Sequence, residues 1–404
     1  MKKLIACILT AALLLSLAAG CTSSLTGMDR DQQEAEDSGL TLHKIGVATY
    51  NLKDAQIMMF KEYLDNYIKS CFPDVTFLYS AGISGSEGLM DFLTLCAEND
   101  VEGVMLFGSY DLQKEVEFCA ENGMYLIRPA ATSSDADFEA VASNPYYLGE
   151  IGPGVEREYE TGAEMARAMA GEEKTYIVFS SRAAEGNEMH RLRTVGILDA
   201  LQEVYGVTFD RSSEELAAAT EPTEAEAGEL RLVICPGYLE EEDRRTAALE
   251  VVSSGRYNTV LSVVPAAPVM DAISEADMEC GVIDCFSEDN DLAFKRGTID
   301  YVAGKYQSQI GPAFAAMYNA ITGYAEDFRE DGRAFRLEQD FWVASNAEEF
   351  DTMFALARGA AVNAYNYEDL CAVIKSLTPE ANFEAFRNLT ESSSYEDCLA
   401  RRSA

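Results

Sequence analysis

Three side chains in this sequence have the chemistry to bind a small polar molecule without reacting with it. Arg193 carries a planar fork of N–H donors that matches adjacent hydroxyls or a carboxylate. Tyr50 and Phe286 offer aromatic faces, which attract C–H groups and cations. Ordinary alternatives exist, because Arg193 can be an exposed helix residue paired with Glu188 or Asp199, and the rings can belong to a core. The residue types therefore indicate non-covalent recognition.

Short polar side chains also stand at the ends of predicted strands. Asn51, Ser109 and Asp284 are an amide, a hydroxyl and a carboxylate, and each follows a short apolar run. Such groups either bind a ligand's polar atoms or cap the loop in which they lie. Both alternatives stay open at this point.

No arrangement of residues points to catalysis, a metal or a cofactor. The sequence has no G-x-S-x-G elbow, no Walker motif and no C-x-x-C pair, and its two histidines, His43 and His190, do not suggest a triad. The formal net charge of −38 repels nucleic acid, so no nucleic-acid partner is expected. We expect a protein that is not an enzyme, with no catalytic residue, no metal and no cofactor.

The elements that carry these residues follow one repeated pattern. An apolar run over 45–48 is followed from Asp54 by apolar residues at spacings of three or four, which predicts a strand, a loop and a helix. Further strands are predicted over 74–80, 101–107, 124–127, 146–151, 175–180, 230–235, 259–264 and 281–284, and further helices over 87–97, 112–121, 156–170, 188–205, 240–253, 268–276 and 309–324. The alternation predicts an α/β fold with parallel sheets, in which ligands bind at the carboxyl ends of the strands.

Glycine and proline at 152–154 mark a crossover between two lobes. Residues 43–150 are predicted to form the first lobe, completed by 287–340, and 151–286 the second, completed by 341–357. Residues 210–229 are interpreted as an acidic surface insertion, and residues 358–404 as a helical C-terminal extension that packs on the outside of a lobe. Cys371 and Cys398 in that extension either pair or remain free.

The first 42 residues predict that the protein is located outside the cytoplasm. A basic start and an apolar run are followed by Leu17-Ala18-Ala19-Gly20-Cys21, which resembles the lipobox of bacterial lipoproteins. The alternative is an ordinary secretory signal with an incidental cysteine. The lipobox implies removal of signal residues 1–20, lipidation at Cys21 and a flexible tether over 21–42.

Three stretches resemble a known family. Lys44-Ile45-Gly46-Val47, Gly103–Phe107 and Arg193-Thr194-Val195-Gly196 are similar in type and order to the type I periplasmic-binding proteins, the sugar-binding, repressor-like receptors of ABC importers. The resemblance covers roughly residues 43–357. It implies two Rossmann-like lobes joined by a three-passage hinge, with a ligand closed between them.

The resemblance also implies a set of ligand-binding positions. They are Tyr50, Asn51, Ser109, Tyr110, Arg193, Asp284 and Phe286. The sequence departs from the family at Gln56-Ile57, where an aromatic pair is usual, at Val264-Pro265, where Asn-Asp is usual, and at Lys305, where a Gln is usual.

The function that follows is a monomeric, lipid-anchored solute-binding protein on the extracytoplasmic face of the cell membrane. It captures a small polar ligand, with a sugar as the first expectation, and delivers it to an ABC permease. One alternative is a receptor that presents its ligand to a membrane signalling protein such as a kinase. Another is a surface interaction protein without a small ligand.

Overall fold

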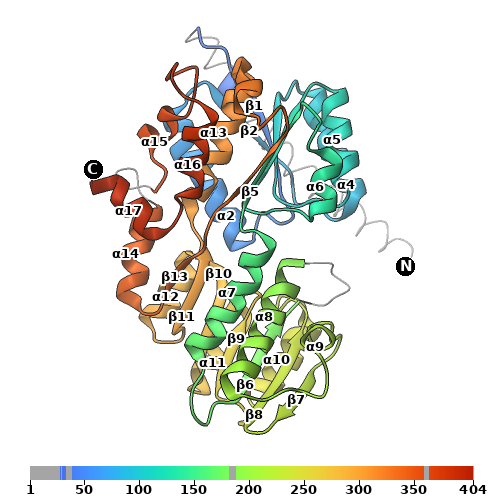
Figure 1. Cartoon of the computed structure of the whole chain (residues 1–404), viewed down its shortest axis with the longest axis vertical. Coiled ribbons are helices and arrows are strands. Elements are labelled where there is room, and N and C mark those ends of the chain that lie inside the picture. The colour runs from blue at the N-terminus through green and yellow to red at the C-terminus, as the bar shows by residue number, and fades with distance from the viewer. Residues whose placement is uncertain (1–27, 29, 33–38, 182–187, 359–363, 404) are drawn as a thin grey trace, which may run out of the picture. The chain divides into compact units, whose positions relative to one another are not determined.

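The computed structural model describes residue 28 and residues 30–32, 39–181, 188–358 and 364–403 (Figure 1). The predicted signal and Cys21 lie outside these described residues. The chain divides into two compact units. Unit 1 comprises the described residues of 1–152, 307–339 and 360–393, and unit 2 those of 153–306, 340–359 and 394–404.

Unit 1 is built on a parallel sheet of six described strands in the order β12-β5-β4-β3-β1-β2. The strands are β1 (His43–Ala48), β2 (Val75–Tyr79), β3 (Gly103–Leu106), β4 (Tyr125–Pro129), β5 (Tyr147–Gly152) and β12 (Phe335–Glu338). Because β1 lies between β2 and β3, the strand order reverses there. In open α/β sheets the crevice beside such a reversal is where ligands bind.

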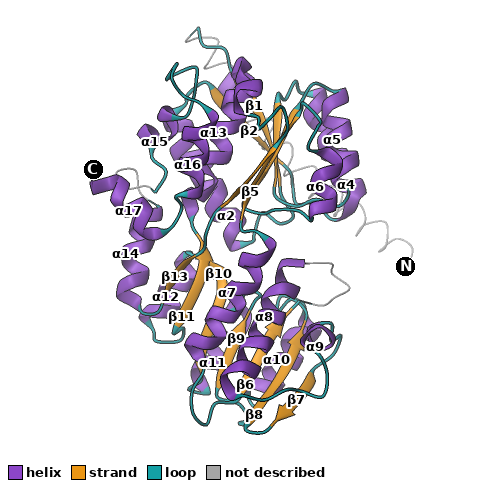
Figure 2. Cartoon of the chain, viewed as in Figure 1, coloured by secondary structure: helices purple, strands orange, loops and turns teal. Residues whose placement is uncertain are grey.

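Helices cover both faces of this sheet, with α4 and α5 on one face and α13 on the other (Figure 2). The helices are α2 (Ala55–Glu62) with its continuation η1 (Tyr63–Ile68) and α3 (Lys69–Cys71), α4 (Gly85–Glu98), α5 (Leu112–Glu121), α6 (Asp135–Val141), η4 (Gln307–Ile310), α13 (Gly311–Asn319), η5 (Ala320–Tyr324), η6 (Ala325–Phe328), α15 (Tyr367–Ala372) and α16 (Phe383–Glu391). Coverage of both faces explains why the strands are continuous apolar runs.

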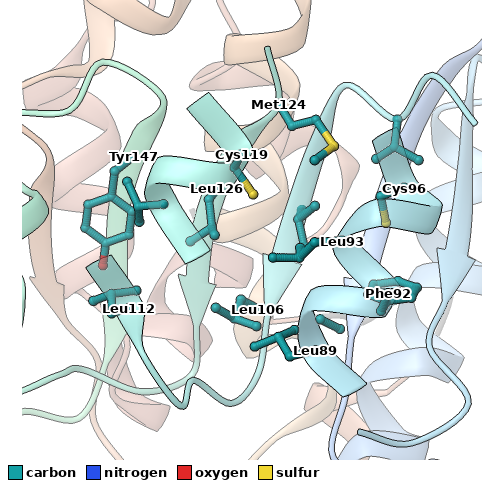
Figure 3. Close-up of a cluster of buried hydrophobic side chains, with 14 of the residues drawn as sticks. Leu89, Phe92, Leu93, Cys96, Leu106, Leu112, Cys119, Met124, Leu126 and Tyr147 are labelled. Atoms are coloured by element: carbon teal, nitrogen blue, oxygen red, sulfur yellow. The ribbon is translucent and has the colours of Figure 1, made fainter. Parts of the chain in front are cut away.

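A buried cluster fixes α4 and α5 against the strands (Figure 3). Leu89 and Leu93 of α4 and Cys119 of α5 pack with Leu106 of β3 and Leu126 of β4. Since each helix is held against the sheet through these side chains, the loops that precede α4 and α5 are held at the carboxyl edge of the sheet. These loops follow β2 and β3.

Unit 2 has a sheet of seven described strands in the order β13-β11-β10-β9-β6-β8-β7. The strands are β6 (Tyr176–Ser180), β7 (Thr223–Ala227), β8 (Leu230–Pro236), β9 (Thr259–Ser262), β10 (Glu279–Cys285), β11 (Tyr301–Lys305) and β13 (Trp342–Ala344). The five inner strands are parallel, whereas the edge strands β7 and β13 run antiparallel to their neighbours. The order reverses at β6, between β8 and β9, as it does at β1 in unit 1.

The helices of unit 2 are α7 (Val155–Met169), α8 (Glu188–Tyr205), α9 (Ser213–Ala217), α10 (Glu242–Val252), η3 (Ala267–Val269), α11 (Met270–Glu275), α12 (Glu288–Lys295), α14 (Ala347–Ala357) and α17 (Tyr395–Ser403). Two glycines allow α7 and α8 to touch through their backbones. A Cβ atom at Gly162 would lie 2.0 Å from the carbonyl oxygen of Arg193, and one at Gly196 would lie 2.1 Å from that of Tyr159. This approach determines where Arg193 lies relative to α7.

The acidic segment 210–229 is not a mere surface insertion, as the sequence suggested. It forms α9, which starts with a capping box of Ser212 and Glu215, and the edge strand β7. Leu216 and Ala225 are buried while the glutamates of β7 face outward. Alternation of small and acidic residues is therefore the pattern of a half-buried edge strand here.

The second passage between units lies at residues 306 and 307 and not near 286. The sequence analysis did not predict α12 or β11. Because β11 pairs in parallel with β10, the chain stays in unit 2 for one more βα repeat. The other two predicted passages lie at 152–153 and 339–340, and the C-terminal extension adds a further passage at 393–394. The α/β fold with two lobes, parallel sheets and a helical C-terminal part is confirmed.

The C-terminal extension contributes to both units. Helices α15 and α16 contact α13 in unit 1 (Figure 1), and Tyr395 at the start of α17 packs edge-on against Trp342 in unit 2 at 5.5 Å. No disulfide joins Cys371 and Cys398, which belong to different units. None of the described helices has the length and apolar character needed to cross a membrane.

Candidate ligand-binding site

Two exposed tyrosines lie at the carboxyl edge of the unit 1 sheet, beside the reversal of strand order. Tyr50 follows β1 and is 43% exposed, and Tyr110 follows β3 and is 50% exposed. Gly108 lies next to the first ring, since a Cβ atom there would be 3.8 Å from Tyr50 Cδ1. The Tyr110 hydroxyl donates to the carbonyl oxygen of Ile83 at 3.2 Å. Both aromatic side chains therefore belong to loops that the sheet brings to one edge.

A buried carboxylate that sequence reasoning missed holds the second of these loops. Glu115 of α5 accepts hydrogen bonds from Ser109 Oγ at 2.5 Å, from Tyr110 N at 2.8 Å and from Asp111 N at 2.9 Å. The hydroxyl of Ser109 thus serves the loop, which is the capping alternative. A glutamate in the first turn of the helix predicted over 112–121 was the available signal. Asn51 is exposed, and its Oδ1 accepts from Lys53 N at 2.9 Å in a local turn.

In unit 2, Arg193 forms a buried ion pair with Glu158 of α7. The Arg193 Nε donates to Glu158 Oε2 at 2.6 Å, and the two residues are 5% and 2% exposed. The sequence suggested an exposed arginine paired with Glu188 or Asp199 as the alternative, and that alternative is wrong. Glu158 was not recognised because no local spacing links it to a residue 35 positions away.

The ion pair leaves polar atoms available on both partners. No hydrogen bond from Arg193 to another described residue is present, so its two Nη atoms remain as a fork of donors. Glu158 Oε1 is buried and has no hydrogen-bond partner among the described residues. A buried acceptor of this kind costs free energy unless it is bound. The arrangement offers donors and an acceptor side by side.

Phe341 and Lys305 lie at the carboxyl end of β11 in the same unit. Trp342 of β13 pairs with Gly304 of β11, which places Phe341 next to Lys305. The Phe341 ring centroid is 5.2 Å from the guanidinium carbon of Arg193 and 6.0 Å from Lys305 Nζ. Both residues are buried. Phe341 was missed by the sequence prediction, although an aromatic residue directly after the predicted passage at 340 was visible.

The two remaining predicted ligand-binding residues, Asp284 and Phe286, differ in burial and contacts. Asp284 of β10 is half-buried, and its Oδ2 accepts from Asn290 Nδ2 at 2.9 Å. Phe286 is 0% exposed and is covered by Phe350, stacked at 4.7 Å, and by Trp342, edge-on at 5.9 Å. The predicted role of Phe286 in stacking on a ligand is wrong, because β13 and α14 bring core aromatics against both sides of its ring.

The two histidines have pKa values shifted in opposite directions. His43 Nδ1 donates to Glu102 at 2.9 Å, and this hydrogen bond, with the carboxylate charge, raises the pKa of His43 against the opposing effect of burial. Burial, followed by the positive charges of Arg193 and Lys305, holds the pKa of His190 well below its ordinary value. At neutral pH the imidazole of His190 is neutral.

We expect the two imidazoles to titrate on opposite sides of pH 6.5, the unfolded value. His43 stabilises the fold below its raised pKa and loses that contribution as pH rises through it, whereas stability linked to His190 falls as pH drops below about 6.5. NMR titration of the imidazole protons tests this. Glu102→Gln should lower the midpoint of His43 and leave that of His190 in place, and identical midpoints in the wild type would contradict the assignment.

Comparison with solved structures gives several matches to solute-binding proteins. A periplasmic sugar-binding protein from Pseudomonas fluorescens matches with a TM-score of 0.59 and 13% identity, over 89% of this chain and 100% of that chain. An ABC transporter solute-binding protein from Bacillus halodurans C-125 with bound myo-inositol matches with a TM-score of 0.56 and 15% identity, over 78% and 97% of the two chains. An ABC transporter periplasmic solute-binding protein from Actinobacillus succinogenes 130z with bound D-allose matches with a TM-score of 0.57 and 13% identity, over 77% of this chain and 99% of that chain.

No family model and no curated protein matches this sequence. The likeness therefore lies in the arrangement of strands and helices, at identities where few side chains are shared. The matches cover 77–89% of this chain, whose two α/β units each have a strand order that reverses at the first strand of the unit. The chain has the fold of the type I periplasmic sugar-binding proteins of ABC transporters.

Proposed function

We propose that this chain is an extracytoplasmic solute-binding protein that binds a sugar and delivers it to the permease of an ABC importer. The observation that carries the proposal is the presentation of Arg193. Its Nε is held by a buried carboxylate while its two Nη atoms remain as donors, and its guanidinium carbon lies 5.2 Å from the centroid of the Phe341 ring. Solved structures with this fold include proteins with bound myo-inositol and bound D-allose.

A sugar has hydroxyl and C–H groups that match the side chains at the carboxyl edge of each sheet. Its hydroxyl oxygens accept hydrogen bonds from the Arg193 fork, and a hydroxyl proton is donated to Glu158 Oε1. The exposed rings of Tyr50 and Tyr110 offer faces to the C–H groups of a pyranose. Asn51 and Asp284 are proposed as further polar contacts, and Ser109 as the residue that positions Tyr110 through Glu115. In this proposal the ligand is held and released unchanged.

The location of the protein at the membrane is a second part of the proposal. Cys21 is proposed to carry the lipid anchor. The described part of the predicted tether over 21–42 corrects that prediction, because Met28 is buried in the cluster of Figure 3 and Asp31 accepts from Lys69 Nζ at 2.5 Å and from Thr76 Oγ1 at 2.6 Å, so this part packs on unit 1. Support for the anchor comes from the lipobox-like sequence that ends at Cys21. Mass spectrometry of the protein from cells tests it, because Cys21→Ser should abolish the acylated form.

Ligand binding is expected to depend on the fork and not only on the charge of Arg193. Arg193→Lys keeps a cation for Glu158 but loses the fork, so sugar affinity should fall about tenfold to a hundredfold. A thermal-shift screen of monosaccharides and inositols identifies the ligand, and titration calorimetry then compares the variants. Alanine is avoided at this position because it would leave a buried carboxylate uncompensated.

Arg167→Lys is the matched control, since Arg167 on α7 makes an exposed ion pair with Glu203. It should bind the sugar as the wild type does. If no sugar raises the melting temperature, the proposed function is wrong. If Arg193→Lys binds with wild-type affinity, the site must be sought elsewhere in unit 2.

A further inference from the structure

Six of the eight cysteines that the structure describes are buried, and two are not. Cys71, the last residue of α3, and Cys371, on α15, are both half-buried. They lie in distant parts of the sequence, but both belong to unit 1. Because burial shields a thiol from reagents, these two are the described thiols that an oxidant in solution can reach.

The helical segment that ends in α3 contacts the segment 365–372, which contains α15, through two successive tyrosines. Tyr63 Oη donates to the carbonyl oxygen of Tyr365 at 2.8 Å. One turn later, the backbone N–H of Tyr367 donates to Tyr67 Oη at 2.8 Å. The contacts therefore advance in the same direction along both segments.

The two cysteines lie in the next turn of these segments. Phe72, which follows Cys71, packs against the ring of Tyr367 with ring centroids 5.5 Å apart. Cys371 lies one helical turn after Tyr367, on the same face of α15. Burial raises the pKa of the Cys371 thiol, its hydrogen bond with Tyr367 lowers it, and the negative charge of a Cys71 thiolate raises it again. The two sulfurs are therefore near neighbours.

We propose that Cys71 and Cys371 form a redox site, at which an oxidant joins the two sulfurs in a disulfide that ties α15 to α3. The oxidant is itself a disulfide, such as glutathione disulfide or the disulfide of a thiol oxidase. The thiolate of one cysteine displaces one sulfur of the oxidant and forms a mixed disulfide, and the thiolate of the other cysteine then displaces the second sulfur. The two protons and two electrons that the protein gives up convert the oxidant into two thiols.

This inference is separate from the proposed ligand. It depends on the surroundings of the chain, because disulfides persist outside the cytoplasm, where the lipobox-like sequence places the protein in our proposal. A cross-link between residues far apart in the sequence restricts the unfolded chain, so the oxidised protein should be more stable than the reduced protein.

The test incubates the full chain with glutathione disulfide at about pH 8, where part of an ordinary thiol is ionised. The remaining thiols are blocked with iodoacetamide, and the peptides are mapped by mass spectrometry without reduction. We expect a peptide pair that joins Cys71 to Cys371. A phosphine reductant should then lower the melting temperature of the oxidised protein by about 5 °C or more.

Cys371→Ser should lack the joined peptide pair and should melt at the same temperature with and without the reductant. Cys71→Ser should give the same two results, so a folding defect in one variant leaves the other to decide. Cys235→Ala is the matched control, since Cys235 is a buried cysteine of unit 2, and it should form the joined pair as the wild type does.

Three outcomes would overturn the inference. Complete alkylation of both Cys71 and Cys371 after the oxidant would show that they do not react. Glutathione that remains on either cysteine would show that the second thiolate does not reach the first sulfur. A joined pair between Cys371 and Cys398 would assign the disulfide to other residues. None of these outcomes affects the sugar screen, so the inference can fail while the proposed function stands.

Discussion

Replacing Glu150 with alanine is expected to lower the free energy of unfolding by about 2–3 kcal/mol, because the change removes the buried carboxylate that two partly buried arginines share. Glu150 of β5 is 0% exposed. It accepts from Arg336 Nε at 2.6 Å, from Arg128 Nη1 at 3.3 Å and from Ser133 Oγ at 2.8 Å. Arg336 lies opposite Glu150 in the register of β12 and β5, so the pair also holds β12 in the sheet.

Urea denaturation of the full chain measures this loss. Glu139→Ala is the matched control, because Glu139 pairs with Arg333 in the same unit but both side chains are largely exposed. Exposed pairs contribute at most about 1 kcal/mol, so this variant should unfold almost as the wild type does. Equal denaturation midpoints for the Glu139 and Glu150 variants would show that Glu150 is not the anchor of β12.

Replacing Gly162 with alanine is expected to destabilise unit 2 by about 3 kcal/mol and to abolish measurable sugar binding. The new methyl group would lie 2.0 Å from the carbonyl oxygen of Arg193, which belongs to backbone and cannot rotate away. The helices must separate, and α8 carries Arg193 away from Glu158. Gly196→Ala, with its contact of 2.1 Å to the Tyr159 carbonyl oxygen, should give the same two effects.

Gly88→Ala provides the control for helix propensity. Gly88 is in α4, where the nearest atom to a new Cβ would be Ile83 Cγ2 at 3.9 Å. With that room, alanine should stabilise the protein by about 0.5–1 kcal/mol. Thermal unfolding and sugar titration are measured on the same samples. A Gly162→Ala variant that keeps full stability and affinity would show that the contact between α7 and α8 does not position Arg193.

Local sequence pattern determined most of the elements of this protein. The predicted helices over 112–121 and 188–205 coincide with α5 and α8, and the apolar run before Tyr50 forms β1. Such elements depend on side chains a few positions apart, which periodicity records directly. The alternation of strand and helix also implied parallel sheets, and with them that Tyr50 and Tyr110 would stand at a carboxyl edge.

The partners of the functional side chains were decided only by the tertiary structure. Arg193 meets Glu158 across 35 residues and Glu150 meets Arg336 across 186, and each contact depends on which helices or strands become neighbours. The same reason explains Phe286, which the sequence placed at a strand end but which β13 and α14 enclose. Periodicity records which face of an element is buried. It does not record what covers that face, because the covering residues can come from any part of the chain.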